Sequence, residues 1–95
     1  MTDATMAVPT VQVDNDQFVV TEWCFAPGAT TGFHRHGMDY VVVPMTTGEL
    51  EIATAGSTFR APLVAGCAYA RLAGVEHEVR NPNDFEFVFV EVERK

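Results

Sequence analysis

Three histidines are the residues of this chain whose type and spacing most directly suggest chemistry. His34 and His36 form an H-x-H pair, and His77 lies well downstream. On a β-strand, side chains two residues apart point to one face and are separated by about 6.6 Å, so two imidazoles can bind one ion. An imidazole from a distant strand would complete a three-ligand site of the kind that holds zinc and similar metals. We therefore predict a metal site formed by His34, His36 and His77.

The elements that must position these histidines are predicted to be strands. β-Branched and aromatic residues recur in short runs divided by Gly, Pro, Asn and Asp, and no stretch has a helical period. The expected strands are 10–13, 18–25, 33–38 and 40–45 (one strand or two collinear ones), 49–53 with its hairpin partner 57–61, 67–71, 77–80 and 85–92. Closely spaced strands without helices favour an all-β sandwich or barrel.

The composition indicates one folded domain, residues 1–95, and argues against polyanionic partners. Apolar residues make up 47% of the chain, which favours a folded core over disorder. Thirteen acidic residues against 6 basic ones give a net charge of −7, which would repel nucleic acid and an anionic membrane surface. We therefore expect neither partner.

The sequence also predicts a cytoplasmic protein. No apolar run approaches the about 20 residues of a membrane span, and residues 1–5 lack the basic start of a signal peptide. Cys24 and Cys67 lie far apart, without the spacing of a redox or metal motif. We expect both to be small buried side chains, with Cys24 near the metal as the alternative.

Because an isolated H-x-H pair also occurs by chance, its surroundings matter. Gly28 is separated from His34 by five residues, and Gly48 follows His36 further along. This arrangement resembles the first motif of the cupins, in which Gly, five residues, His-x-His, three or four residues, Glu, six residues and Gly follow one another. The resemblance covers about residues 28–48.

The segment around His77 resembles the second cupin motif, in which Gly, five residues, Pro-x-Gly, two residues, His, three residues and Asn follow one another. The residues in register, over about 66–81, are Gly66, Gly74, His77 and Asn81. Leu72 stands in place of the proline, which only relaxes the entry to the loop. The resemblance implies a cupin β-barrel, also called a jelly roll or double-stranded β-helix, with a metal held by the three histidines.

The glutamate ligand of the first motif is missing. Tyr40 stands four residues after His36, where the glutamate would be, and Asp39 precedes it. Simple alternation places Tyr40 inward and Asp39 outward. We favour a three-histidine site with Tyr40 beside the ligands or donating a hydrogen bond to a metal-bound water. A bulge at Gly37 would make Asp39 the carboxylate ligand, and the simpler alternatives are a barrel-filling Tyr40 and a surface Asp39 paired with Arg35.

The resemblance implies a divalent transition metal, with Fe, Mn, Ni and Zn all open, because ligand affinity alone does not choose among them. Arg71, on the strand that leads into the second motif, could bind a substrate carboxylate, or it lies on the surface. No catalytic residue is assigned. Glu22 and Glu91 are further carboxylates that could act as a general base, although strand carboxylates are usually solvated.

Cupins include dioxygenases, isomerases, decarboxylases and binding proteins, so the resemblance does not select a reaction. Segments 21–23, 34–36 and 39–44 look most like the small cupins associated with β-alanine degradation. We expect a metal-dependent enzyme that acts on a small polar acid in amino-acid or related catabolism. The alternative is a noncatalytic cupin that binds or senses a metabolite. Exposed strand edges also suggest a homodimer.

Overall fold

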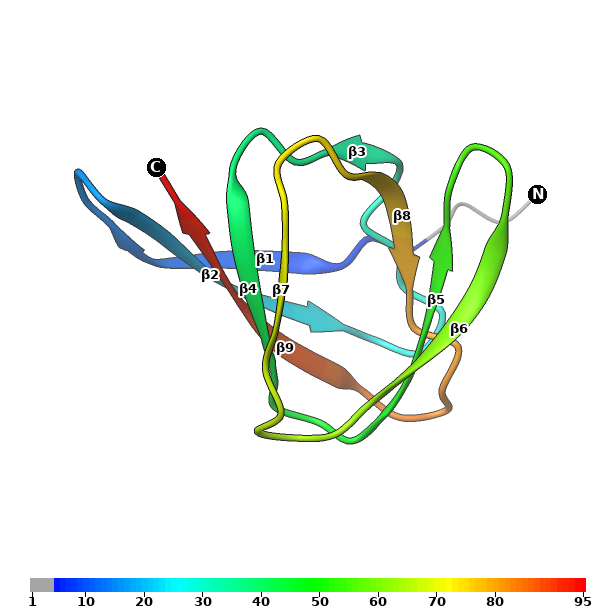
Figure 1. Cartoon of the computed structure of the whole chain (residues 1–95). Helices are drawn as coiled ribbons and strands as arrows, with labels where there is room; N and C mark the ends of the chain where they lie inside the picture. Colours follow the sequence, from blue (N-terminus) through cyan, green and yellow to red (C-terminus); the bar gives the residue numbers. More distant parts are fainter. Residues whose placement is uncertain (1–4) are drawn as a thin grey trace.

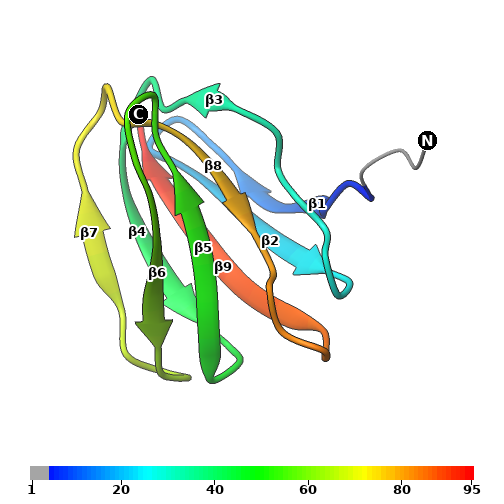
Figure 2. The same cartoon turned by 90° about the vertical axis from the view of Figure 1, so that its right-hand side faces the viewer.

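The computed structural model describes residues 5–95, which form two antiparallel β-sheets that face each other (Figures 1 and 2). The five-stranded sheet has the order β1-β2-β9-β4-β7, and the four-stranded sheet has the order β3-β8-β5-β6. The strands are β1 (Val8–Asp14), β2 (Phe18–Phe25), β3 (His34–Arg35), β4 (Asp39–Pro44), β5 (Gly48–Ala53), β6 (Thr58–Leu63), β7 (Tyr69–Arg71), β8 (Glu76–Arg80) and β9 (Phe87–Arg94). The predicted all-β architecture is confirmed. Within residues 5–95, no helix is long and apolar enough to cross a membrane.

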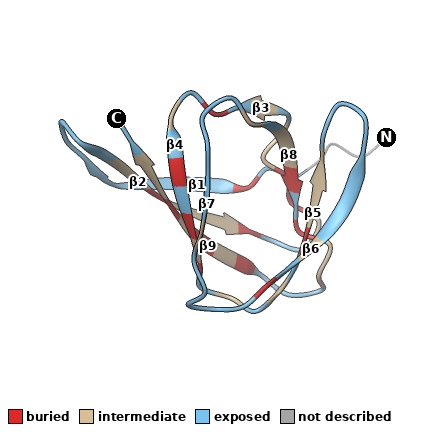
Figure 3. Ribbon diagram, viewed as in Figure 1, coloured by how far each residue is buried: buried red, intermediate tan, exposed pale blue. Residues whose placement is uncertain are grey.

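The core lies between the sheets and follows the alternation of the strands. On β9, Phe87 and Phe89 are 0% and 4% exposed, whereas the valines between them are only partly buried. Phe25, at the end of β2, is the register partner of Phe87 and is also fully buried. Figure 3 shows short buried segments on strands of both sheets, separated by partly buried and exposed ones. Each strand therefore presents one dry face and one wetter face.

The segment around the H-x-H pair forms two strands rather than one. β3 ends at Arg35 and pairs with β8 in the four-stranded sheet, whereas β4 begins at Asp39 and pairs with β7 and β9 in the other sheet. The chain bends at residues 36–38 as it passes between the sheets. The bend places His36 at the corner where the two sheets meet.

Asn81 links the ends of the two sheets from a fully buried position directly after β8. Its Nδ2 donates to the carbonyl oxygens of Phe25 and Phe85 at 3.1 and 2.8 Å. Its Oδ1 accepts a hydrogen bond of 2.9 Å from the backbone N–H of Asn83. Because a buried amide without such partners would destabilise the fold, these bonds explain an asparagine at this position.

The prediction of two buried cysteines is wrong for Cys67, which is exposed, whereas Cys24 is partly buried. Cys67 precedes β7, which begins only at Tyr69 and is shorter than the predicted strand 67–71. The side chain of Cys67 therefore lies in a surface turn. Cys24 lies on the face of β2 opposite its inward neighbour Phe25, and both thiols are free.

Candidate metal centre

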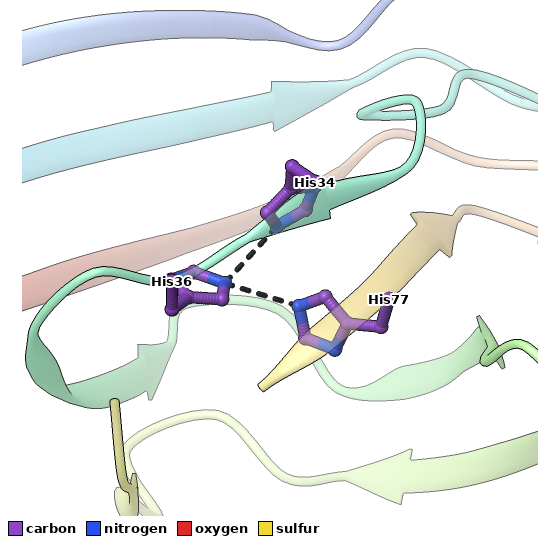
Figure 4. Close-up of side chains that lie close together, drawn as sticks. All are labelled: His34, His36 and His77. Atoms are coloured by element: carbon purple, nitrogen blue, oxygen red, sulfur yellow. Dashed lines mark hydrogen bonds between the residues drawn. The ribbon is translucent and has the colours of Figure 1, made fainter. Parts of the chain in front are cut away.

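The structure brings His34, His36 and His77 together at one end of the barrel (Figure 4). His34 and His77 are register partners on β3 and β8, and His36 follows in the bend. The Nε2 atom of His36 lies 3.0 Å from Nε2 of His34 and 3.1 Å from Nε2 of His77. All three rings therefore direct the same nitrogen toward a common point.

The backbone holds His36 against the loop that precedes His77. The backbone N–H of His36 donates to the Val75 carbonyl at 2.9 Å, and the N–H of Gly74 donates to the His36 carbonyl at 2.7 Å. Gly74 has a φ of 98°, which a residue with a side chain rarely adopts. This glycine therefore allows the tight loop that precedes His77 within the second motif.

The tautomer of His34 follows from its hydrogen bond to the backbone. Its Nδ1 lies 2.9 Å from the carbonyl oxygen of Gly32, which can only accept, so Nδ1 carries the hydrogen. Nε2 of the neutral ring then has a free lone pair directed at the other histidines. A hydrogen bond of this kind orients metal-binding histidines in many proteins.

The arrangement of the three nitrogens fits a shared cation better than a hydrogen-bonded cluster. A ring nitrogen carries either one hydrogen or one lone pair, so Nε2 of His36 cannot form good hydrogen bonds to both neighbours. In an octahedral site, adjacent nitrogen ligands about 2.1 Å from one ion lie at right angles and are therefore about 3.0 Å apart. The observed separations of 3.0 and 3.1 Å match that value. The cluster could therefore hold a divalent transition metal.

The environment keeps two of these rings neutral. Burial, followed by the neighbouring His34 and His77, lowers the pKa of His36 to about 4. Burial, followed by His34 and Arg71, lowers the pKa of His77 to about 4. Near pH 7 both rings therefore offer lone pairs rather than a positive charge, as metal ligands must.

Tyr40 lies directly against the cluster. Its ring stacks on His36 with centroids 3.9 Å apart and an interplanar angle of 19°, and the residue is 3% exposed. Its hydroxyl is buried and has no hydrogen-bond partner among residues 5–95. Burial, followed by Glu91, raises the pKa of Tyr40 to about 12, so the hydroxyl stays protonated. The structure thus places a hydrogen-bond donor without a partner beside the histidines.

Glu91 and Glu93 approach His36 from the opposite sheet. One ring nitrogen of His36 and one carboxylate oxygen from each glutamate lie within 4.8 Å of one another. Glu91 is 7% exposed, and burial followed by the nearby Glu93 raises its pKa to about 7. Sequence reasoning named Glu91 as a candidate general base, with a solvated strand carboxylate as the more usual case, and did not single out Glu93. The signal was present, because both acids share the inward face of β9 with Phe87 and Phe89.

The structure does not bring Asp39 or Glu22 to the cluster. Oδ1 of Asp39 accepts a hydrogen bond of 2.8 Å from the backbone N–H of Ala73, and the residue is exposed. The inward face of β4 instead carries Tyr40, because no bulge reverses the alternation. Glu22 lies on the face of β2 opposite Trp23, which lines the interior.

A cavity of about 230 Å³ adjoins the histidines and has walls from both sheets. Its polar lining comes from residues that include Trp23, His34, Tyr40, Arg71, His77 and Glu91. The guanidinium of Arg71 lies 4.8 Å from the centroid of the Tyr69 ring and donates to the Ala70 carbonyl at 3.1 Å. Nε1 of Trp23, like the Tyr40 hydroxyl, is buried without a hydrogen-bond partner in the described chain.

Two antiparallel sheets that enclose a three-histidine cluster are the architecture of a cupin, and solved structures agree. A cupin domain from Bordetella pertussis superposes with a TM-score of 0.98 at 55% identity, covering 100% of this chain and 99% of that one. A cupin with a double-stranded β-helix fold from Methanocaldococcus jannaschii has a TM-score of 0.77 at 15% identity, covering 97% and 83%, and shows the fold alone. The chain belongs to the cupin superfamily.

A named relative places the chain more narrowly. It is 61% identical over 95 residues to the Beta-alanine degradation protein BauB of Pseudomonas aeruginosa, and the match covers 100% of both chains. No protein-family model matches the sequence. The chain is thus a small cupin closely related to BauB.

Proposed function

We propose that this protein is a metal-dependent enzyme that acts on a small polar acid in β-alanine or related amino-acid catabolism. The observation that carries the proposal is the convergence of three Nε2 atoms beside a cavity. The name of its relative BauB supports the catabolic assignment. A divalent metal held by His34, His36 and His77 would supply Lewis acidity and would activate a bound water or substrate oxygen.

The donors around the cavity support an acid as the ligand. Trp23 and Tyr40 line the cavity with their rings, and their N–H and O–H groups are buried without partners among the described residues. The guanidinium of Arg71, which also lines it, can bind a carboxylate through two parallel hydrogen bonds. The guanidinium therefore favours a ligand that carries a carboxylate.

The dimensions of the cavity support a small ligand. A water molecule occupies about 30 Å³ in the liquid. A volume of about 230 Å³ therefore accommodates a molecule of amino-acid or keto-acid size rather than a cofactor or a peptide.

Elemental analysis of protein expressed without a polyhistidine tag tests the metal centre, together with diffraction data collected at the metal absorption edge. We expect about one metal per chain and an anomalous peak between the three Nε2 atoms. Reconstitution with Fe(II), Mn(II), Ni(II) or Zn(II) would identify the ion that supports activity. Protein that binds none of the four, with His36→Ala behaving like the wild type, would refute the metal centre.

Steady-state turnover of small carboxylic and amino acids tests catalysis in each metal form. We expect product formation from at least one acid, and no product from the His36→Ala variant. Saturable binding of an acid without product from any metal form would instead assign a binding or sensing role to the protein.

We also propose that the protein forms a homodimer. β1 is an edge strand of the five-stranded sheet, and its Val8, Val11 and Val13 are 59%, 59% and 42% exposed. Apolar edge strands are commonly covered by a second subunit. Sedimentation equilibrium at micromolar concentration should give the mass of two chains, and a compact monomer would contradict this.

A further inference from the structure

Glu91 is an unusual residue for the inner face of a β-barrel. It is 7% exposed, and no hydrogen bond or ion pair joins its carboxylate to any other residue of the described chain. A buried carboxylate without a partner destabilises a protein, and a bound cation is one of the few groups that compensate for this cost. The position therefore requires an explanation beyond packing.

The sheet register places Glu91 beside His36, one of the three histidines, in a group that also contains Glu93. β9 lies between β2 and β4, and Glu91 is the register partner of Thr21 on one side and of Val42 on the other. One oxygen of its carboxylate lies within 4.8 Å of a ring nitrogen of His36. The residue also lines the same cavity as His34 and His77.

No other side chain supplies the missing partner. The Tyr40 hydroxyl itself has no hydrogen-bond partner among residues 5–95. No ion pair joins the Arg71 guanidinium to Glu91 within residues 5–95; the guanidinium donates to the Ala70 carbonyl and lies over the Tyr69 ring. A cation held at the histidine cluster would pair with the deprotonated form of this carboxyl.

Tyr40 leaves β4 without a carboxylate beside the histidines. It stands at the position of the motif's glutamate and fills that place with a ring stacked on His36. The strand that would otherwise carry an acidic ligand therefore offers a phenol. Its neighbour β9 carries Glu93 directly opposite Tyr40, and Glu91 two residues earlier on the same face.

We propose that Glu91 is the carboxylate ligand of the metal centre and replaces, from the neighbouring strand, the glutamate that the first motif lacks. The proposal rests on the proposed three-histidine metal site. Glu93 is the competing candidate, because it has the same charge, faces the same way and belongs to the same group with His36. Glu93 is only partly buried and does not line the cavity. With Glu91 bound, a divalent ion keeps one net positive charge and open positions for a small acid.

Glu91→Gln and Glu93→Gln, compared with the wild type, test the ligand assignment. Zn(II) affinity would be measured by competition with a chelator, and the ligand set would be measured from the visible absorption of the Co(II) form. We expect Glu91→Gln to lose at least about tenfold in affinity and to change the Co(II) spectrum. Glu93→Gln should stay within about twofold of the wild type and keep its spectrum.

Thermal unfolding of the metal-free proteins separates a ligand from a structural residue. Metal-free Glu91→Gln should melt at the same or a higher temperature than the metal-free wild type, because a buried unpaired carboxylate is removed. The rise in melting temperature on adding Zn(II) should be smaller for Glu91→Gln than for the wild type. A structural role for Glu91 would instead lower the melting temperature of the metal-free variant.

Two further results would overturn the assignment. The first is wild-type affinity and an unchanged Co(II) spectrum in Glu91→Gln, and the second is a larger loss in Glu93→Gln than in Glu91→Gln. Either result leaves the three-histidine site intact. A wild-type protein that binds no metal would refute the metal centre itself, so the two failures are distinguishable.

Discussion

The two walls of the cavity bury ionisable groups of opposite kind. The four-stranded sheet and the bend after β3 contribute histidines, whereas β9 of the five-stranded sheet contributes Glu91. Burial lowers the pKa of His36 and His77 to about 4 and raises that of Glu91 to about 7. Both walls therefore resist their charged forms. A divalent cation favours the deprotonated form of every one of these groups, so its binding is compatible with both the histidines and the carboxylate.

The largest effect should follow from removing a ligand on the histidine wall. We expect His77→Ala to weaken Zn(II) binding by about a hundredfold or more, because two imidazoles remain where three converge. Isothermal titration and metal analysis after dialysis would measure the loss. Glu76→Ala, which changes the exposed neighbour on β8, is the control and should retain the metal. Equal metal content in His77→Ala and wild type would contradict the assignment.

A second prediction concerns the residue that joins the walls. Asn81→Ala removes the buried side-chain hydrogen bonds from the end of β8 to the carbonyl oxygens of Phe25 and Phe85. We expect a loss of about 2 to 4 kcal/mol in the free energy of unfolding, measured by urea denaturation. Asn15→Ala, which removes only an exposed turn contact, should cost about 1 kcal/mol or less. If Asn81→Ala costs no more than Asn15→Ala, other contacts must hold the two sheets together at this end.

Arg71 should affect ligand binding without affecting the metal. On the five-stranded wall, Arg71 is the register partner of Tyr40 and lines the cavity. We expect Arg71→Gln to raise the KM or Kd for an acid ligand by about tenfold, the cost of about 1.4 kcal/mol. Metal content should be unchanged. Arg60→Gln, on exposed β6, is the control, and an equal effect of the two substitutions would count against a role for Arg71.

The smallest effect is a difference in the pH dependence of stability of the metal-free protein. His36 and His77 have pKa values lowered from 6.5 to about 4, so their contribution is complete above pH 6.5 and is lost as the pH falls toward 4. The pKa of Glu91 is raised from 4.5 to about 7, so its contribution is present below pH 4.5 and is lost as the pH rises through 7. As the pH falls from 6.5 to 4.5, the histidines therefore lower the stability of the metal-free protein while Glu91 raises it.

Replacing Glu91 should remove its opposing contribution to the pH dependence of stability and leave that of the two histidines. We expect metal-free Glu91→Gln to lose stability more steeply than the wild type as the pH falls from 6.5 to 4.5, measured by urea denaturation across that range. Glu86→Gln, on the segment before β9, should follow the wild type. Parallel curves for Glu91→Gln and wild type would show that Glu91 does not titrate as its burial implies.

Local patterns in the sequence predicted much of the fold. Strand 18–25 was predicted with the bounds of β2, and the hairpin 49–61 corresponds to β5 and β6. These elements are readable because alternation and turn residues act over a few positions. The sequence did not decide whether residues 33–45 form one strand or two. The answer depends on pairing partners in two different sheets, which lie far away in the sequence.

The histidines and the spacing of their motifs were determined by the sequence alone, as was the loss of the usual glutamate. Only the tertiary structure decided that Asp39 braces a loop and that Glu91 lies in a dry interior beside His36. Alternation assigns a side chain to one face of a strand. Whether that face is wet or dry depends on the packing of the two sheets, which residues far apart in the chain determine together.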